Sequence, residues 1–135
     1  MQSKLGHLQF GIDGKNRGFY RDLFTCLGWK ILYDVEGLLA VGDSNQVSLW
    51  FSDATKTVAN DYDGLGLNHL AIHTATQADV DQAAAFLAEH GIAHLFETPR
   101  HRPDFAQDPN STYYQVMFET PDRILGEVVY IGPKQ

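Results

Sequence analysis

The two halves of the chain repeat one pattern of residues. Leu5-Gly6-His7-Leu8 is echoed by Leu67-Asn68-His69-Leu70, so that the two histidines are 62 positions apart. An amphipathic stretch follows each motif and ends at a glycine, Gly28 in the first half and Gly91 in the second. A unit of about 62 residues buries too little surface to be stable alone. The duplication therefore predicts two similar modules that pair to form one domain over residues 1–135.

Each half is predicted to be a βαβββ module of an α+β protein. Leu8, Phe10 and Ile12 alternate with polar residues, as in a half-buried strand, and Phe19 and Leu23 recur at helical spacing. Thr76 and Asp79 resemble a capping box at the start of the second helix. We expect module 1 over about 4–52, a polar linker over about 53–66 and module 2 over about 67–132. The expected strands are 4–12, 29–33, 38–41 and 46–51, then 67–72, 94–97, 113–118 and 125–131, with the first helix over about 15–27.

The segment 98–112 interrupts the second module. Pro99, Pro103 and Pro109 are expected to prevent regular structure there. A connection of this length is either a functional lid or a mobile insertion. Arg100 and Arg102 within it could meet an anionic substrate, but a solvated loop is the favoured interpretation.

Composition and charge narrow the partners. Of the 135 residues 44% are hydrophobic, which suits a globular protein, and the net charge of −7 opposes binding to nucleic acid. Cys26 is the single cysteine, so no intrachain disulfide can form, and a reducing compartment fits best. No run approaches the ~20 apolar residues of a membrane span, and no signal peptide is evident. We expect a cytoplasmic protein without a membrane partner.

Three residues suggest a metal site. His7 and His69 occupy the same position in the two modules, on the polar face of each first strand, and Glu127 is a lone charge in an otherwise apolar run. Two histidines and one carboxylate form a facial set for a divalent metal with open positions for substrate. The alternative is that each histidine is a structural residue and Glu127 a charge on an edge strand.

With these motifs, the chain resembles the vicinal oxygen chelate superfamily, which includes glyoxalase I, bleomycin-resistance proteins, fosfomycin-resistance enzymes and type I extradiol dioxygenases. The resemblance covers nearly the whole chain. It implies that the two modules form a curved mixed sheet with a metal in its concavity, and His7, His69 and Glu127 match the metal-binding positions. Its landmarks are the two histidine motifs, Phe19-Tyr20-Arg21-Asp22-Leu23, Leu27-Gly28-Trp29, Tyr113-Tyr114-Gln115-Val116-Met117-Phe118-Glu119, Pro121-Asp122 and Glu127-Val128-Val129-Tyr130.

Departures from relatives narrow the chemistry. Glyoxalase I supplies a glutamate from the last strand of its first module, where the alignment places Ser48, and a hydroxyl cannot serve as a carboxylate base. Fosfomycin enzymes carry a hydroxyl where this chain has Gln9, and a cation beyond the last glutamate, where Lys134 is the sole charge. The extradiol pattern matches best and favours Fe²⁺ or Mn²⁺, with Zn²⁺ or Ni²⁺ as alternatives.

The resemblance also suggests which residues surround the metal. His73 is a candidate acid/base, or a residue that contacts substrate or is merely tolerated in its strand. The candidate substrate-binding residues are Gln9, Ser48, Trp50, Tyr113, Gln115 and Met117.

Two functions follow as hypotheses. The first is a divalent-metal-dependent enzyme, extradiol-dioxygenase-like or lyase-like, that acts on a small oxygen-rich molecule. The alternative is a metal-free drug-binding protein of the bleomycin-resistance type, in which an acidic groove lined by Trp50, Phe51, Tyr113 and Tyr114 sequesters a cation. Relatives commonly dimerise, so a homodimer is expected.

Overall fold

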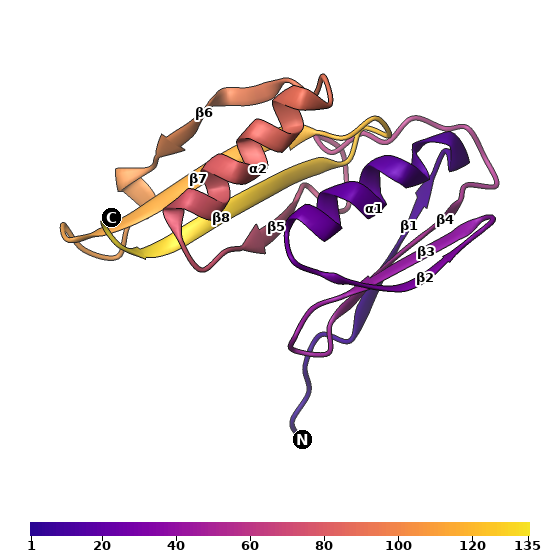
Figure 1. The fold of residues 1–135 in the computed structure, drawn as a ribbon, viewed down its shortest axis with the longest axis horizontal. Helices are drawn as coiled ribbons and strands as arrows, with labels where there is room; N and C mark the ends of the chain where they lie inside the picture. The colour runs from indigo at the N-terminus through magenta and orange to yellow at the C-terminus, as the bar shows by residue number, and fades with distance from the viewer. The chain divides into compact units, whose positions relative to one another are not determined.

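The computed structural model describes residues 1–135, which divide into two compact units, Met1–Val58 and Ala59–Gln135. Each unit holds one α-helix and one four-stranded mixed sheet (Figure 1). Both units run β-α-β-β-β along the chain, which confirms the predicted α+β class and the predicted order of elements. The stretch expected to be a linker, 53–66, spans the boundary between the units.

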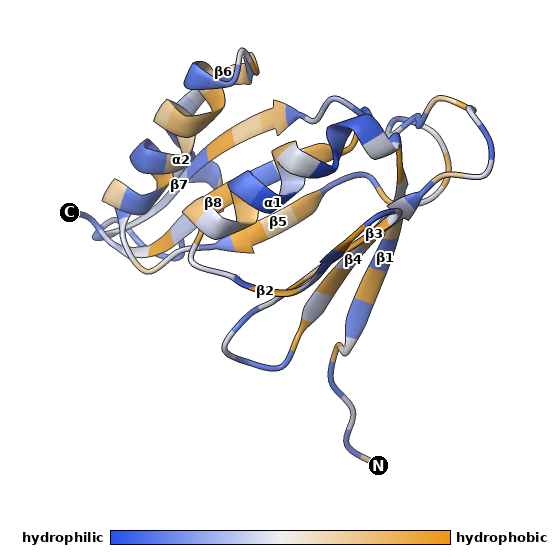
Figure 2. Ribbon diagram, turned by 45° about the vertical axis from the view of Figure 1, so that its right-hand side comes forward, coloured by the Kyte–Doolittle hydropathy of each residue, from blue (hydrophilic) through white to orange (hydrophobic).

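In unit 1 the first strand lies beside the last. The sheet order is β1-β4-β3-β2, with β1 parallel to β4 and the other pairs antiparallel. The alternation of polar and apolar residues along β1 is visible as bands in Figure 2. The elements of unit 1 are β1 (His7–Ile12), a 3₁₀ turn (Gly14–Asn16), α1 (Arg17–Cys26), β2 (Lys30–Val35), β3 (Leu38–Gly42) and β4 (Ser48–Asp53).

Aromatic residues form the core of unit 1. Phe51 of β4 stacks on Tyr20 of α1 with ring centroids 4.5 Å apart and on Phe10 of β1 at 5.3 Å. Leu23 and Phe24 of the helix are also buried. These contacts hold α1 against one face of the sheet, and the polar residues of β1 lie on the opposite face, together with Trp50 of β4.

Unit 2 repeats this topology. The sheet order is β5-β8-β7-β6, again with the first and last strands parallel. Val80, Ala83 and Leu87 of its helix are buried, as are Val116 and Val128 of the sheet. The elements of unit 2 are β5 (Leu70–His73), α2 (Gln77–Glu89), β6 (His94–His101), a 3₁₀ turn (Pro103–Phe105), β7 (Ser111–Glu119) and β8 (Leu125–Pro133).

The predicted helix signals are confirmed. Thr76 and Asp79 form a capping box, in which the hydroxyl oxygen of Thr76 accepts from the backbone of Asp79 and the Asp79 carboxylate accepts from the backbone of Thr76. Gly28 and Gly91 follow the two helices with φ of 79° and 71°, a conformation that favours glycine. No helix of the chain is long and apolar enough to cross a membrane.

The prediction for segment 98–112 is partly wrong, because β6 continues past Pro99 to His101. The pairing of β6 with β7 is interrupted between Leu95 and Arg100, so Pro99 lies where no backbone N–H is needed by the ladder. Pairing then resumes, with Arg100 opposite Gln115. Arg100 is therefore a strand residue rather than part of a solvated loop.

One glycine of β8 is required by the packing of its neighbour on β7. Gly126 pairs with Phe118, and a Cβ atom at Gly126 would lie 2.5 Å from Cζ of that ring. The Phe118 ring is buried, with 3% of its surface exposed, so it cannot move aside without disturbing the core. Gly126 thus fixes the contact between two central strands immediately before Glu127.

Gly126→Ala is expected to lower the free energy of unfolding by about 1–3 kcal/mol, because the added methyl overpacks the Phe118 site. Denaturant unfolding followed by circular dichroism measures the change. Gly6→Ala is the matched control, since a Cβ at Gly6 has no neighbour within 4 Å and should leave stability nearly unchanged. Equal midpoints for both variants would contradict this account of the packing.

Candidate functional site

His69 and Glu127 meet in unit 2. Nε2 of His69 lies 3.2 Å from Oε2 of Glu127. Glu127 is on β8, between β5 and β7, and only 2% of the residue is exposed, whereas the His69 side chain is 39% exposed. The sequence predicts a strand over 67–72 that includes His69. In the structure β5 begins at Leu70, so His69 lies one residue before the strand. A buried carboxylate therefore faces an accessible imidazole nitrogen.

The side chain of Asn68 sets the orientation of His69. Nδ2 of Asn68 donates to the backbone carbonyl of Tyr62 at 2.9 Å, which turns Oδ1 of Asn68 toward the imidazole. Oδ1 is 2.8 Å from Nδ1 of His69, and since a carbonyl oxygen can only accept, Nδ1 must carry the proton. Nε2 is left to face Glu127, to which it offers a lone pair in the neutral ring and an N–H donor in the protonated ring.

Tyr113 contacts the second oxygen of the same carboxylate. Its hydroxyl donates to Oε1 of Glu127 at 2.7 Å. Burial, this hydrogen bond and the charge of Glu127 raise the pKa of Tyr113 to about 12. The phenol therefore stays protonated near neutral pH and acts as a fixed donor to Glu127.

Three more of the predicted residues lie on the same face of this sheet. Met117 pairs with Glu127, while Gln115 and His73 both pair with Val129, two residues further along β8. Alternate residues of a strand share a face, so all three are on the side of Glu127. Gln115 is buried and His73 is exposed, and neither touches the His69–Glu127 pair through a hydrogen bond.

The remaining predicted residues are in unit 1. His7 pairs with Ser48, and both lie on the polar face of β1 and β4. Gln9 donates to Ser52 Oγ at 3.1 Å, and Trp50 donates through Nε1 to Ser48 Oγ at 3.0 Å. His7 is exposed and sits in a different unit from His69 and Glu127. Neither unit by itself groups three histidine, cysteine or carboxylate side chains around one point.

Strand pairing shows which residue of unit 1 corresponds to Glu127. In unit 2, Glu127 pairs with Ala71, two residues after His69. In unit 1, the residue two positions after the histidine is Gln9, and its partner on the last strand is Trp50. Trp50 therefore stands where the other repeat has its carboxylate.

This register differs from the one inferred from sequence. The alignment placed Ser48 at the position of the glyoxalase I glutamate, whereas Ser48 pairs with His7 itself. The position equivalent to Glu127 holds the hydroxyl of Ser48 in the sequence alignment and the indole of Trp50 in the strand register. Neither residue supplies a carboxylate.

Two aromatic residues assigned to a groove by the sequence face a helix instead. Phe51 is 2% exposed and stacks on Tyr20 of α1. Tyr114 donates through its hydroxyl to Asp81 of α2 at 2.6 Å. Strand alternation explains the error. Phe51 follows Trp50 and Tyr114 follows Tyr113, and neighbouring residues of a strand point to opposite faces of the sheet.

Sequence reasoning missed Asn68, and it considered Arg100 and Arg102 as contacts to an anionic substrate but favoured a solvated loop. Asn68 precedes His69 directly, and this adjacency was the available signal. Arg100 and Arg102 were assigned to a solvated loop, but the Arg102 side chain is only 21% exposed. Its guanidinium lies 4.4 Å from the ring centroid of Phe105, and Phe105 packs edge-on against Tyr113.

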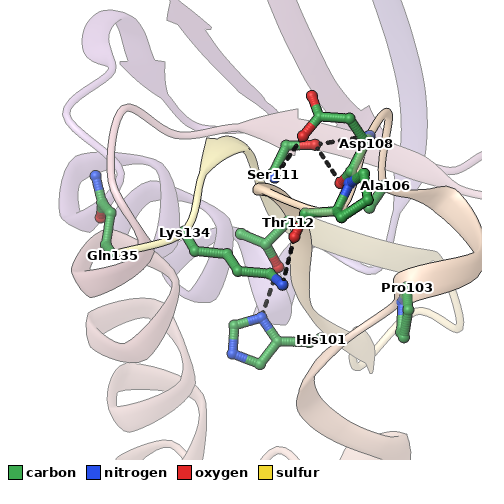
Figure 3. Close-up of a pocket in the computed structure, with 9 residues that line it drawn as sticks. His101, Pro103, Ala106, Asp108, Ser111, Thr112, Lys134 and Gln135 are labelled. Carbon is green, nitrogen blue, oxygen red and sulfur yellow. Dashed lines mark hydrogen bonds between the residues drawn. The ribbon is translucent and has the colours of Figure 1, made fainter.

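A pocket of ≈ 610 Å³ lies elsewhere in unit 2, between the segment 101–112 and the end of the chain (Figure 3). His101 lines it and packs on Tyr114, which places the pocket on the α2 side of the sheet, away from Glu127. Its polar groups bind one another, as in the contacts from His101 to Thr112 at 2.6 Å and from Lys134 to the Pro109 carbonyl at 2.7 Å.

Comparison with known proteins identifies the fold. No family model and no curated protein matches the sequence. Among solved structures, a candidate glyoxalase from Bacillus halodurans is 28% identical, with a TM-score of 0.78 over 96% of each chain. A glyoxalase/dioxygenase from Nostoc punctiforme is 20% identical, with a TM-score of 0.72 over 96% of this chain and 91% of the other. Lactoylglutathione lyase from Agrobacterium tumefaciens is 18% identical, with a TM-score of 0.65 over 96% and 95%.

These neighbours confirm the resemblance inferred from the sequence motifs. The same βαβββ order occurs twice, and the likeness extends over nearly the whole of each chain. The chain therefore has the glyoxalase/bleomycin resistance/dioxygenase fold, and its structural neighbours are those expected of a vicinal oxygen chelate protein.

Proposed function

We propose that the protein is a divalent-metal-dependent enzyme that acts on a small oxygen-rich molecule. His69 and Glu127 would hold the metal together with His7 of the first module. The observation that carries the proposal is the position of His69 Nε2, turned by Asn68 toward the carboxylate of Glu127, a residue of which 2% is exposed. Fe²⁺ or Mn²⁺ is favoured, with Zn²⁺ or Ni²⁺ as alternatives.

The donor set supports a cation at this point. A neutral imidazole lone pair and a carboxylate oxygen 3.2 Å apart repel each other unless a proton or a metal ion lies with them. A histidine that binds a metal through one ring nitrogen characteristically donates a hydrogen bond from the N–H of the other nitrogen to a fixed acceptor. Here Oδ1 of Asn68 is that acceptor. Tyr113 in turn holds the carboxylate through Oε1 and leaves Oε2 to the imidazole side.

The first module supports the proposed reaction class. Trp50 occupies the position equivalent to Glu127, so a fourth, carboxylate ligand that could also act as a base is missing from β4. Two histidines and one carboxylate favour an extradiol-dioxygenase-like activity over a glyoxalase-like lyase. When bound, the metal would act as a Lewis acid on two neighbouring substrate oxygens.

The protein's own side chains would position the substrate and move protons. His73 is exposed on the Glu127 face and is the proposed acid/base. The proposed contacts to substrate are Tyr113, Gln115 and Met117 from unit 2 and Gln9, Ser48 and Trp50 from unit 1. A homodimer and a cytoplasmic location remain predictions.

His69→Ala and Glu127→Gln are each expected to weaken metal binding by more than about 100-fold, because each removes a ligand. Elemental analysis of the purified protein and calorimetric titration with Mn²⁺ measure the loss, and circular dichroism verifies folding. His90→Ala is the matched control, since His90 contacts only the end of its own helix, through Nδ1 to the Phe86 carbonyl and by stacking on the Phe86 ring. Unchanged uptake by folded His69→Ala protein would refute the ligand set.

Asn68→Ala is expected to weaken metal binding by about 10- to 100-fold without abolishing it, because the imidazole loses the acceptor that fixes its tautomer. The same calorimetric titration measures the change. Asn60→Ala provides the control, since Asn60 lies in the same segment and its amide donates to the Arg123 carbonyl at 2.7 Å rather than to a histidine. If both variants bound metal like the wild type, the proposed role of Asn68 would be wrong.

A metal-free binding protein is the second candidate. The net charge of −7 and the pairing of Tyr33 with Trp50, with ring centroids 5.7 Å apart, favour a cationic or aromatic ligand on unit 1. The burial of Phe51 against α1 and the contact of Tyr114 with α2 remove half of the aromatic residues on which this hypothesis relied.

Titration of chelator-treated protein with metal-free bleomycin separates the two candidates. The enzyme proposal predicts no saturable heat of binding, together with saturable Mn²⁺ binding in a parallel titration. The binding-protein hypothesis predicts the reverse, and tight bleomycin binding without any metal uptake would replace the enzyme proposal.

A further inference from the structure

A group of hydrogen-bond donors lies on the Glu127 face of the unit 2 sheet. Tyr113, Gln115 and Met117 share that face, and Met117 pairs directly with Glu127. Arg100 of β6 pairs with Gln115 of β7, and residues directly opposite in an antiparallel ladder project to the same side. Arg100 therefore joins the same surface as Glu127.

Arg102 extends this surface beside Tyr113. Its backbone N–H donates to the Tyr113 carbonyl at 2.7 Å, which extends the pairing of β6 with β7 by one residue beyond His101. Its guanidinium carbon lies 4.4 Å from the Phe105 ring centroid, and that ring packs edge-on against Tyr113 with centroids 5.4 Å apart. Stacking thus holds Arg102 next to the phenol that donates to Glu127.

Three donors on these side chains are buried and have no acceptor. They are Nε2 of Gln115, Nε of Arg100 and Nε of Arg102. Gln115 is the most enclosed, with 2% of its surface exposed. Buried polar groups nearly always find a partner, and an unpaired one is costly, so three unpaired donors on one face require an explanation.

The outer nitrogens of both arginines are engaged at the solvent side. Nη1 of Arg100 lies 3.1 Å from Glu97, and Nη2 of Arg102 lies 3.5 Å from Asp104. The side chains of Glu97 and Asp104 are 88% and 68% exposed, so these pairs restrain the guanidinium groups only weakly. Neither pair supplies an acceptor for the inner Nε–H groups.

We propose that Arg100, Arg102 and Gln115 form a carboxylate-binding subsite beside Glu127, so that the substrate carries a carboxylate in addition to the oxygens that the metal would chelate. All three unpaired groups are N–H donors and two belong to cations, so the complementary ligand group is an anionic acceptor. A planar carboxylate suits guanidinium and amide donors. The inference rests on the proposed function, because the carboxylate belongs to the same substrate.

Calorimetry with paired probes tests this subsite. In Mn²⁺-loaded protein, 3,4-dihydroxybenzoate is expected to bind about 10- to 100-fold more tightly than catechol, as charge-assisted hydrogen bonds would give. The ratio of the two affinities, 3,4-dihydroxybenzoate over catechol, should fall toward one in Arg100→Gln, Arg102→Gln and Gln115→Leu proteins. Lys134→Gln is the control, because it removes a cation from the pocket on the α2 side and should keep the full ratio. Arg100→Gln, at a side chain that is 41% exposed, keeps the test valid if Gln115→Leu fails to fold.

A second pair of probes separates this subsite from the metal site. In chelator-treated protein, benzoate should bind more tightly than benzyl alcohol, and this preference should vanish in Arg100→Gln and Arg102→Gln proteins. A benzoate preference in a protein that takes up no metal would refute the metal proposal alone. Metal uptake with equal binding of 3,4-dihydroxybenzoate and catechol would overturn the subsite alone. Tighter binding of phenylphosphonate than of benzoate, or no saturable binding of either carboxylate probe, would also overturn it.

Discussion

The burial of one charge dominates the second repeat. Glu127 sits in the middle of a four-stranded sheet with 2% of its surface exposed, and a carboxylate in such a place must be compensated. Tyr113 donates to one oxygen and His69 faces the other. Asn68 and Gly126 serve the same carboxylate indirectly, the first by orienting the imidazole and the second by allowing β8 to lie against Phe118.

The two repeats share one backbone topology but carry different side chains at equivalent positions of their polar faces. Both repeats place the first and last strands side by side in parallel and pack one helix on one face of the sheet. At equivalent points of the ladder, however, one repeat carries Glu127 and the other Trp50. Topology was thus retained while the two polar faces diverged, one toward charge and donors, the other toward hydroxyl and indole groups.

The fold was predictable because local patterns and the repeat agree. The helix caps at Thr76, Gly28 and Gly91 are local signals, and the structure has each of them. Errors arose where a long-range partner decides. β6 passes through Pro99 because β7 offers renewed pairing beyond the interruption. Ser48 pairs with His7 and does not stand at the position of Glu127, because the register of β1 with β4 is set between strands far apart in the sequence. The meeting of His69 with Glu127 was anticipated, whereas the contribution of Asn68 depends on a carbonyl six residues earlier.

That carbonyl belongs to Tyr62, in the stretch that joins the two repeats. Tyr62 is itself held by its hydroxyl, which donates to Glu119 at 2.6 Å. The seven residues from Tyr62 to Asn68 therefore set the distance between an anchor at the end of β7 and the amide that determines which nitrogen of His69 faces Glu127. A change in the length of this connection would alter which nitrogen of the imidazole faces Glu127, while every candidate ligand stayed in the sequence.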